Sequence, residues 1–97
     1  LYTGYDYLKS GLRHFWMKIR YFAWIKDITN NEDEEINSEK INNLDELKVF
    51  IIKKYPDLRK HFDKEILRFA VNKEYVTKNI NLNANDEIAI FPPVSGG

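Results

Sequence analysis

The segment Glu87-Ile88-Ala89-Ile90-Phe91-Pro92-Pro93-Val94-Ser95-Gly96-Gly97 closes the chain and decides the fold. Residues 87–91 are rich in β-branched and aromatic side chains, which predicts a final β-strand. Pro92 and Pro93 end strand pairing because proline has no N–H, and they stiffen the residues after them. Gly96 and Gly97 lack a Cβ, so this backbone can enter a narrow channel and let a nucleotide approach its carbonyl. We therefore expect a tail whose chemistry lies at the Gly97 carboxylate. The alternative is a frayed end without a role.

A first strand is expected near the start of the domain. Residues 18–24 are aromatic and β-branched, and their alternation puts Ile19 on one face and Phe22 on the other. A polar turn over 27–35 should follow, and its run of acidic residues is typical of a solvated loop. A short second strand near 35–40 would complete a hairpin.

One main helix is predicted next. Asn43 has the character of an N-cap, and Glu46 lies three residues further on, as in a capping box. The helix is expected to end near Tyr55, because Pro56 disfavours helical geometry in the residue before it. Apolar side chains recur at helical spacing at Leu44, Leu47, Ile51 and Tyr55, with Phe50 adjoining.

The second half of the chain is predicted to form strands joined by short turns. Residues 57–65 form a connector that can hold a single helical turn, and 67–72 alternate as a third strand. Residues 73–74 should make a tight turn, after which 75–76 begin a return strand. A turn at 83–86 then leads into the last strand.

The element order is therefore β-β-α-β-β-β, which predicts an α+β fold. A small mixed sheet of four to five strands would be crossed by one main helix and bury one face against it. The expected core consists of Ile19, Tyr21, Leu44, Leu47, Ile51, Leu67, Phe69, Val71, Ile88 and Ile90.

The composition favours a soluble globular protein. Its 97 residues suit one domain, and 43% hydrophobic against 31% charged residues is too apolar for a disordered chain. The formal net charge is zero, so no global field favours nucleic acid or an anionic membrane, and we expect neither as a partner. Cysteine is absent, which excludes disulfides, thiolate metal sites and a cysteine nucleophile, and fits a cytoplasmic location.

Residues 1–16 differ in character from the rest. They are rich in aromatic residues and lack a clean period of 2 or 3.6, and the only methionine, Met17, follows at once. We expect 1–16 to be a non-native or flexible N-terminal extension and 17–97 to form the domain. The alternative is a true arm that docks its aromatic side chains on a partner.

Four segments in fixed order carry a resemblance to a known family. They are Tyr21-Phe22-Ala23, Ala70-Val71-Asn72, Asp86-Glu87-Ile88-Ala89 and the ending from Phe91 to Gly97. In that order they resemble the small, sulfur-carrying subunits of molybdopterin synthase, which are ubiquitin-like β-grasp proteins. The resemblance covers 17–97. Its specific part is the ending, whereas 30–65 agree only in pattern.

The resemblance implies a chemistry for Gly97. An adenylyltransferase similar to ubiquitin-activating enzymes would join AMP from ATP to the carboxylate, because the acyl-phosphate anhydride supplies the leaving group that a carboxylate lacks. A sulfur donor protein would then displace AMP and leave a thiocarboxylate. In the large synthase subunit the sulfur would attack cyclic pyranopterin monophosphate. The tail inserted there would comprise Pro92, Pro93, Val94, Ser95, Gly96 and Gly97.

On this resemblance the chain is a co-substrate and non-catalytic subunit. It would form a heterotetramer with the large subunit, which would hold the catalytic residues, and bind no cofactor stably, since the activating enzyme consumes the ATP. The residues agree with this. His14 and His61 lie far apart with no second ligand at metal spacing, and no glycine-rich loop precedes a helix. No metal site is expected.

Three aromatic residues are candidates for docking the large subunit. Phe22 lies on the face opposite the core positions of its strand. In the last strand, the alternation of side chains places Phe91 on the same face as Ala89. The family places apolar interface residues at these two positions and at Tyr75. An exposed aromatic patch beside the tail is the expected form of a partner anchor, and packing at the edge of the core is the alternative.

Other functions could begin from the same ending. A thiamine-type sulfur carrier shares the two glycines and the activation chemistry, but such carriers tend to be shorter and to lack the double proline. A ubiquitin-like modifier would end in an amide bond to a lysine instead of a thiocarboxylate. A third possibility is a binding domain whose tail has no role, and deletion of Gly97 would then leave its function unchanged.

Overall fold

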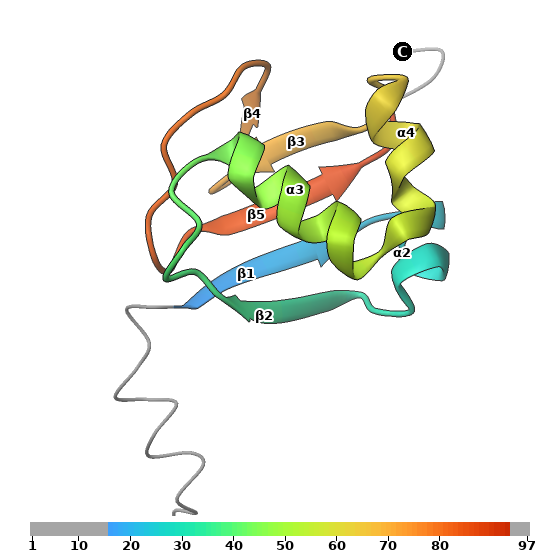
Figure 1. Cartoon of the computed structure of the whole chain (residues 1–97). Helices are drawn as coiled ribbons and strands as arrows, with labels where there is room; N and C mark the ends of the chain where they lie inside the picture. The colour runs from blue at the N-terminus through green and yellow to red at the C-terminus, as the bar shows by residue number, and fades with distance from the viewer. Residues whose placement is uncertain (1–15, 94–97) are drawn as a thin grey trace, which may run out of the picture.

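The computed structural model describes residues 16–93, which form a five-stranded mixed sheet crossed on one face by a helix (Figure 1). The strands lie in the order β2-β1-β5-β3-β4. This confirms the predicted α+β class with one main helix. The elements are β1 (Trp16–Tyr21), α2 (Trp24–Thr29), β2 (Asp33–Asn37), α3 (Leu44–Lys54), η2 (Pro56–Leu58), α4 (Arg59–Asp63), β3 (Arg68–Val71), β4 (Glu74–Val76) and β5 (Glu87–Phe91).

The two central strands, β1 and β5, run parallel. Lys18 lies beside Glu87 and Tyr21 beside Ile90, so both strands end at the same edge of the sheet. Antiparallel partners complete the sheet: β2 pairs with β1, and β3 pairs with both β5 and β4. The last strand is therefore hydrogen-bonded on both sides, and the tail leaves the sheet from a firmly held position.

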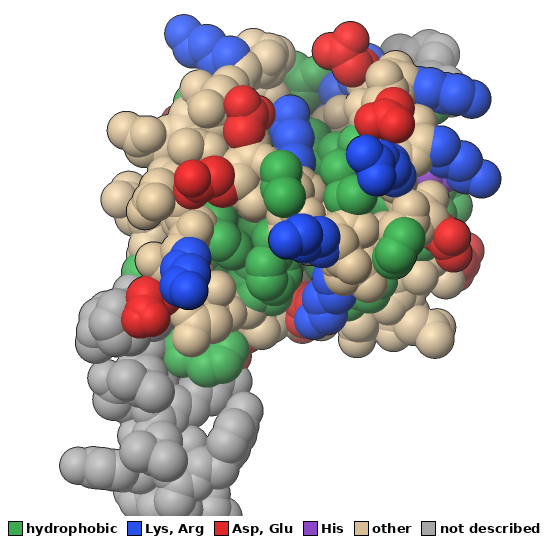
Figure 2. Space-filling view, in the orientation of Figure 1, with side chains coloured by type: hydrophobic (Ala, Val, Ile, Leu, Met, Phe, Trp, Pro, Cys, Tyr) green, Lys and Arg blue, Asp and Glu red, His purple; other side chains and the backbone are tan. Residues whose placement is uncertain are grey.

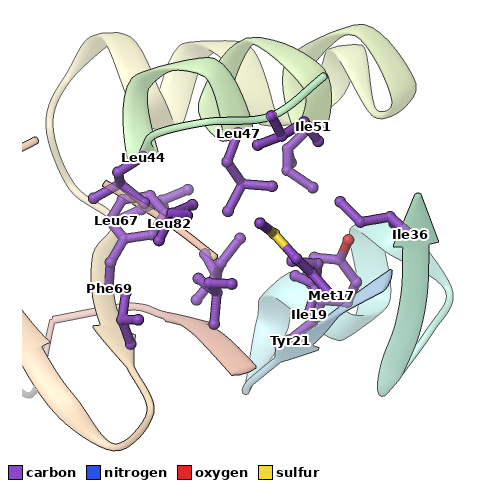
Figure 3. Packing of buried hydrophobic residues seen from close by; sticks show 14 of the residues in the cluster. Met17, Ile19, Tyr21, Ile36, Leu44, Leu47, Ile51, Leu67, Phe69 and Leu82 are labelled. Atoms are coloured by element: carbon purple, nitrogen blue, oxygen red, sulfur yellow. The ribbon is translucent and has the colours of Figure 1, made fainter. Parts of the chain in front are cut away.

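The hydrophobic core lies between the sheet and α3 (Figure 3). Strand alternation sends every second side chain toward the helix, and all ten predicted core residues are buried there. Each fully buried aliphatic side chain contributes about 1.5–3 kcal/mol, so the sheet is a well-supported platform. The residues of the core that the sequence analysis did not include are Met17, Ile25, Ile36, Ile41, Leu58 and Leu82.

The start and end of α3 follow the sequence prediction. The Asn43 side chain accepts a hydrogen bond of 2.9 Å from the backbone N–H of Glu46. The Glu46 carboxylate in turn accepts one of 2.7 Å from the Asn42 N–H, so two otherwise unpaired donors at the helix start are satisfied. The helix ends at Lys54, and Tyr55 caps it before Pro56.

The prediction of a strand over 18–24 was wrong at its C-terminal end. β1 stops at Tyr21, and Trp24 begins the helix α2. The chain turns because Ala23 takes a φ of 55° and a ψ of −137°, a conformation that its β-like neighbours do not predict. The turn places Ile25 in the core at 0% exposure. The predicted polar turn over 27–35 is therefore partly helical.

Two further boundaries differ from the predictions. The second strand is β2 over 33–37 instead of 35–40, because pairing with β1 sets Ile36 opposite Met17, where it is buried. Much of the acidic run is thus strand and not loop. The tight turn lies at Asn72 and Lys73 instead of 73–74, and both residues have positive φ, at 51° and 73°.

The remaining element predictions are confirmed or lie outside the described residues. The connector 57–65 carries the expected helical turn, which extends over η2 and α4. Trp16 is already part of β1, where it pairs with Asn37. Residues 1–15 are not described, so the N-terminal extension stays a prediction.

Candidate docking face and tail exit

The tail exit lies where β1 and β5 end together. Past the last paired residue of β1, the backbone N–H of Phe22 donates a 3.1 Å hydrogen bond to the Ile90 carbonyl, which holds the end of β5 against the first strand. Phe91 and Pro92 are half-buried and Pro93 is exposed. The predicted tail residues Val94, Ser95, Gly96 and Gly97 lie outside the described residues, and their roles stay predictions.

A row of four residues crosses the sheet face that points away from α3. The strand registers place Arg20 beside Ala89, Ala89 beside Ala70, and Ala70 beside Tyr75. The two alanines have the smallest side chains that still pack, so the middle of the face is shallow. Its two sides are a guanidinium and a phenol. Such a floor leaves room for a side chain from another protein.

The three predicted docking aromatics all border this face. Tyr75 is 58% exposed, and its ring centroid lies 6.3 Å from that of the half-buried Phe91. Phe22 is 39% exposed and contacts a cation, since the Arg20 guanidinium lies 5.4 Å from its ring centroid. The structure therefore brings Tyr75 and Phe91 together as a pair, whereas Phe22 belongs with Arg20.

Arg20 connects the aromatic and charged parts of the face. Besides its contact with Phe22, it forms an ion pair of 3.4 Å with Glu87, the residue before Ile88 on the neighbouring strand. Both side chains are partly exposed, so this pair contributes little stability by itself. Its main effect is to orient the guanidinium over the sheet, where it can bind a carboxylate of a partner.

Asn72 and Asp86, two residues of the family motif, fasten the sheet from its other end. The Asn72 amide donates to the Asp86 carboxylate at 2.9 Å and accepts from the Glu87 N–H at 2.9 Å. Its backbone N–H also donates to the Glu87 carbonyl at 2.7 Å. These contacts tie the β3–β4 turn to the start of β5, so they set the register that aligns Ala70 with Ala89.

A half-buried carboxylate lies on the opposite, helix-facing side of the sheet. Glu34 of β2 accepts hydrogen bonds of 2.6 Å from the hydroxyls of Tyr21 and Tyr55 and from the Lys54 ammonium. Burial would raise the pKa of Glu34, but the hydrogen bonds from Lys54 and the two tyrosines outweigh it and lower that pKa. Burial, followed by the hydrogen bond to Glu34, raises the pKa of Tyr21 well above its usual value. The sequence analysis missed this cluster because it assigned Glu34 to a solvated loop.

His61, expected to be a lone histidine, packs against Trp24 with the two ring planes tilted by 52°. The ring centroids lie 4.6 Å apart and join α2 to α4. Within residues 16–93 no three histidines, acidic residues or cysteines come together in a way that could hold a metal ion. None of the helices in that range is both long and apolar enough to cross a bilayer.

Arg20, Ala70 and Ala89 are the face residues that the docking prediction did not include. Alternation had already placed Arg20 and Ala89 opposite the core, and this signal could have found them. Their alignment with Tyr75 depends on strand register between distant segments, which no local pattern contains.

The chain is similar to proteins of known family. The profile of the ThiS family matches residues 19–97. The molybdopterin synthase sulfur carrier subunit of Dictyostelium discoideum is 39% identical over 87 residues, which cover 82% of this chain and 94% of that protein. The family match includes Arg20, Ala70, Tyr75, Ala89 and Phe91 of the docking face.

Solved structures agree with the fold. A Pyrococcus furiosus chain, assigned by its name to subunit 1 of molybdopterin converting factor, superposes with a TM-score of 0.72 at 25% identity, covering 81% of this chain and 98% of that one. A chain from the complex of subunits 1 and 2 of the Helicobacter pylori molybdopterin-converting factor superposes with a TM-score of 0.62 at 29% identity, covering 84% and 99%. The family resemblance is thereby confirmed: the chain belongs to the ThiS family of β-grasp proteins, alongside molybdopterin synthase sulfur carrier subunits.

Proposed function

We propose that the chain is the sulfur carrier subunit of molybdopterin synthase and that its Gly97 carboxylate carries the sulfur. The observation that supports this most strongly is the 39% identity to a carrier subunit over nearly its whole length. The family match also runs through Gly97, so the two terminal glycines belong to the shared sequence and not to an appended end.

The proposed chemistry takes place on the last carbonyl carbon. The Gly97 carboxylate attacks the α-phosphate of ATP in the activating enzyme, which releases pyrophosphate and forms an acyl-adenylate. A sulfur donor protein delivers sulfur at the oxidation level of sulfide to the acyl carbon, and AMP leaves with the electron pair of the broken C–O bond. The product is a thiocarboxylate. In the large subunit its sulfur attacks cyclic pyranopterin monophosphate. Water then cleaves the bond between the Gly97 acyl carbon and sulfur, which leaves the sulfur on the pterin and restores the Gly97 carboxylate. No cofactor needs to stay bound to the carrier.

The geometry of the described residues suits this role. β5 is held between two strands, so Phe91 and Pro92 form a fixed base for the tail. The aromatic pair Tyr75–Phe91 borders the same base. A partner that binds this face therefore receives the tail at a defined position, which is what insertion into a buried active site requires. The large subunit is the proposed partner, in the two-plus-two assembly that the family resemblance implies.

Deletion of Gly97 tests the proposal. The truncated chain, the large subunit and cyclic pyranopterin monophosphate are combined with activating enzyme, ATP and sulfur donor, and molybdopterin is measured. We expect the full chain to support synthesis and the truncated chain to support none. Unchanged thermal unfolding serves as the control for folding, because the described core residues do not include Gly97. Binding to the large subunit is measured as well, so that a loss of synthesis can be assigned to chemistry or to association.

The same preparation separates the alternatives. A thiamine-type carrier would be loaded with sulfur but would not support molybdopterin synthesis with the large subunit. A protein modifier would appear in cell extracts joined by an amide bond to lysines of other proteins. Synthesis by the truncated chain at the full rate would refute a role for Gly97.

A further inference from the structure

A groove lies on the helix side of the sheet, between α3, α4 and the edge strand β4. It holds about 360 Å³, and its floor is apolar, formed by side chains such as Phe62 and Phe69, whose rings pack with centroids 5.8 Å apart. Val76 of β4 also lines it. The proposed sulfur chemistry makes no use of this groove.

The rim of this groove is basic. Lys48, Arg68 and Lys78 line it, against one acidic residue, Glu65. The Arg68 guanidinium donates to the backbone carbonyls of Glu65 and Ile66 at 2.8 and 3.2 Å, so its charge is not cancelled by a carboxylate there. Figure 2 shows the same face, with Lys and Arg side chains lying among hydrophobic ones.

The two lysines at the rim are open to a ligand. The Lys48 ammonium lies 5.0 Å from the Phe69 ring centroid and only 4.0 Å from Asp45, which is the outer limit of an ion pair. Lys78 forms no ion pair within residues 16–93. An anionic group placed over the apolar floor would therefore find two cations without displacing a strong partner.

The wall formed by β4 offers backbone hydrogen bonds. β4 is an edge strand, with β3 on one side only. The two-residue turn at Asn72 and Lys73 makes Val71 and Glu74 the closing hydrogen-bonded pair of the hairpin, so the next pair, Ala70 and Tyr75, is not hydrogen-bonded. The backbone N–H and C=O of Tyr75 consequently point outward, where an added strand can pair with them.

We propose that this groove binds an extended, acidic peptide segment of a protein partner by strand addition to β4. The peptide backbone pairs with Tyr75, one apolar side chain enters the groove over Phe62 and Phe69, and flanking carboxylates contact Lys48 and Lys78. The ligand is expected to be a peptide because only a peptide backbone can pair with the N–H and C=O groups of β4. It is expected to be acidic because the charged residues at the rim of the groove are mostly basic.

The groove and the docking face share Tyr75 and otherwise lie on opposite sides of the sheet. The groove opens on the helix side, whereas Ala70, Ala89 and the Phe91 ring face the other side of the sheet. The inference does not rest on the proposed sulfur chemistry, and the peptide pairs with the backbone of Tyr75, whereas the Tyr75 ring pairs with Phe91.

The test uses a fluorescein-labelled heptapeptide, Asp-Glu-Val-Ile-Val-Glu-Asp, titrated into the full chain and followed by anisotropy and amide NMR. We expect micromolar binding, with shifts concentrated at Tyr75, Val76 and Thr77. The double variant Lys48→Glu, Lys78→Glu should bind at least tenfold more weakly. The double variant Lys53→Glu, Lys60→Glu changes the net charge equally outside the groove and should bind as the parent chain does.

Two further probes examine the mode of binding. A heptapeptide with lysine in place of each acidic residue should not bind, and one N-methylated at its central residue should lose the backbone pairing and most of its affinity. The proposal is overturned if the charge-reversed groove variant binds normally or if the N-methylated peptide keeps its affinity. Shifts that map to Ala89 and Phe91 would overturn it as well. The proposal is also overturned if acetate alone, or self-association of the chain, produces the same NMR shifts as the peptide, because neither result would require a peptide ligand.

Discussion

Phe91 occupies the point where the sheet face meets the tail, and its role can be tested by one substitution. Its ring pairs with Tyr75 on the face opposite the core, so truncation should spare the fold and remove an aromatic anchor. We expect Phe91→Ala to weaken binding to the large subunit by more than about 1 kcal/mol in calorimetry. Val49→Ala, which truncates an exposed apolar residue on α3, is the matched control and should leave the affinity unchanged. Equal affinities for both variants would exclude Phe91 from the interface.

Ala23 has a strained backbone conformation, and this also yields a prediction. Its φ of 55° and ψ of −137° suit glycine and not a residue with a Cβ. Ala23→Gly should relieve this strain, although glycine also gives the unfolded chain more conformational entropy, which opposes folding. We expect the net effect to raise the free energy of unfolding by about 1 kcal/mol.

Asn30→Gly provides the comparison for Ala23. Asn30 has a φ of 63° and a ψ of 24°, the left-handed region that asparagine tolerates, so we expect a change below about 0.5 kcal/mol. Urea unfolding of the three proteins measures both effects. A lower stability for Ala23→Gly than for the parent chain would show that the turn is unstrained.

Single residues also show how far the sequence could be interpreted. Alternation placed Phe22 and Phe91 opposite the core, and the ten predicted core residues are buried. Ala23 escaped prediction because a positive φ at alanine has no local signal. Glu34 escaped because four consecutive acidic residues suggest solvent, whereas tertiary contacts with Tyr21 and Tyr55 outweigh that tendency.

At the scale of elements, Glu34 joins β2 to β1 and to the end of α3. Its carboxylate accepts three hydrogen bonds of 2.6 Å, one from Tyr21 of β1 and two from Lys54 and Tyr55 at the end of α3. Hydrogen bonds to a charged group contribute more than neutral ones, so Glu34→Gln should lower the free energy of unfolding at pH 7 by about 1–3 kcal/mol. Glu32→Gln, at an exposed position just before β2, should cost less than about 0.5 kcal/mol.

The pH dependence of this cost has a defined sign. The pKa of Glu34 is lowered in the folded protein from an ordinary value of 4.5, so its contribution is present above that value and is lost as the pH falls through the folded pKa. Gln cannot titrate. The difference in the free energy of unfolding between Glu34→Gln and the parent chain, measured by urea unfolding, should therefore become smaller from pH 7 to pH 3. A constant difference would mean that the Glu34 charge is not stabilised by its partners.

The elements themselves were predictable to different degrees. α3 carries its own signals, namely the Asn43 cap, helical spacing and Pro56, and it begins and ends as predicted. α2 has six residues and too few periods to be recognised, and the aromatic run before it favours a strand. The prediction placed the start of β2 two residues and its end three residues too late, because pairing with β1 sets its position, and register is a tertiary property.

The whole molecule is a sheet with two different faces and one projecting end. The helix side buries the core and opens the basic groove beside β4, while the other side carries the alanine floor and the aromatic pair. Both sides depend on β5, whose central place fixes the base of the tail. This division suits the proposed function, in which the tail brings the Gly97 carboxylate to a partner that binds the other side of the sheet.

Intact-mass spectrometry of the chain tests this most directly. The full chain is incubated with activating enzyme, ATP and sulfur donor, and its mass is compared with that of the chain lacking Gly97 under the same conditions. We predict that the full chain gains the mass difference between sulfur and oxygen, that fragmentation places the change on Gly97, and that the truncated chain gains nothing. An unchanged full chain, when a known carrier is loaded in the same mixture, would contradict the proposal.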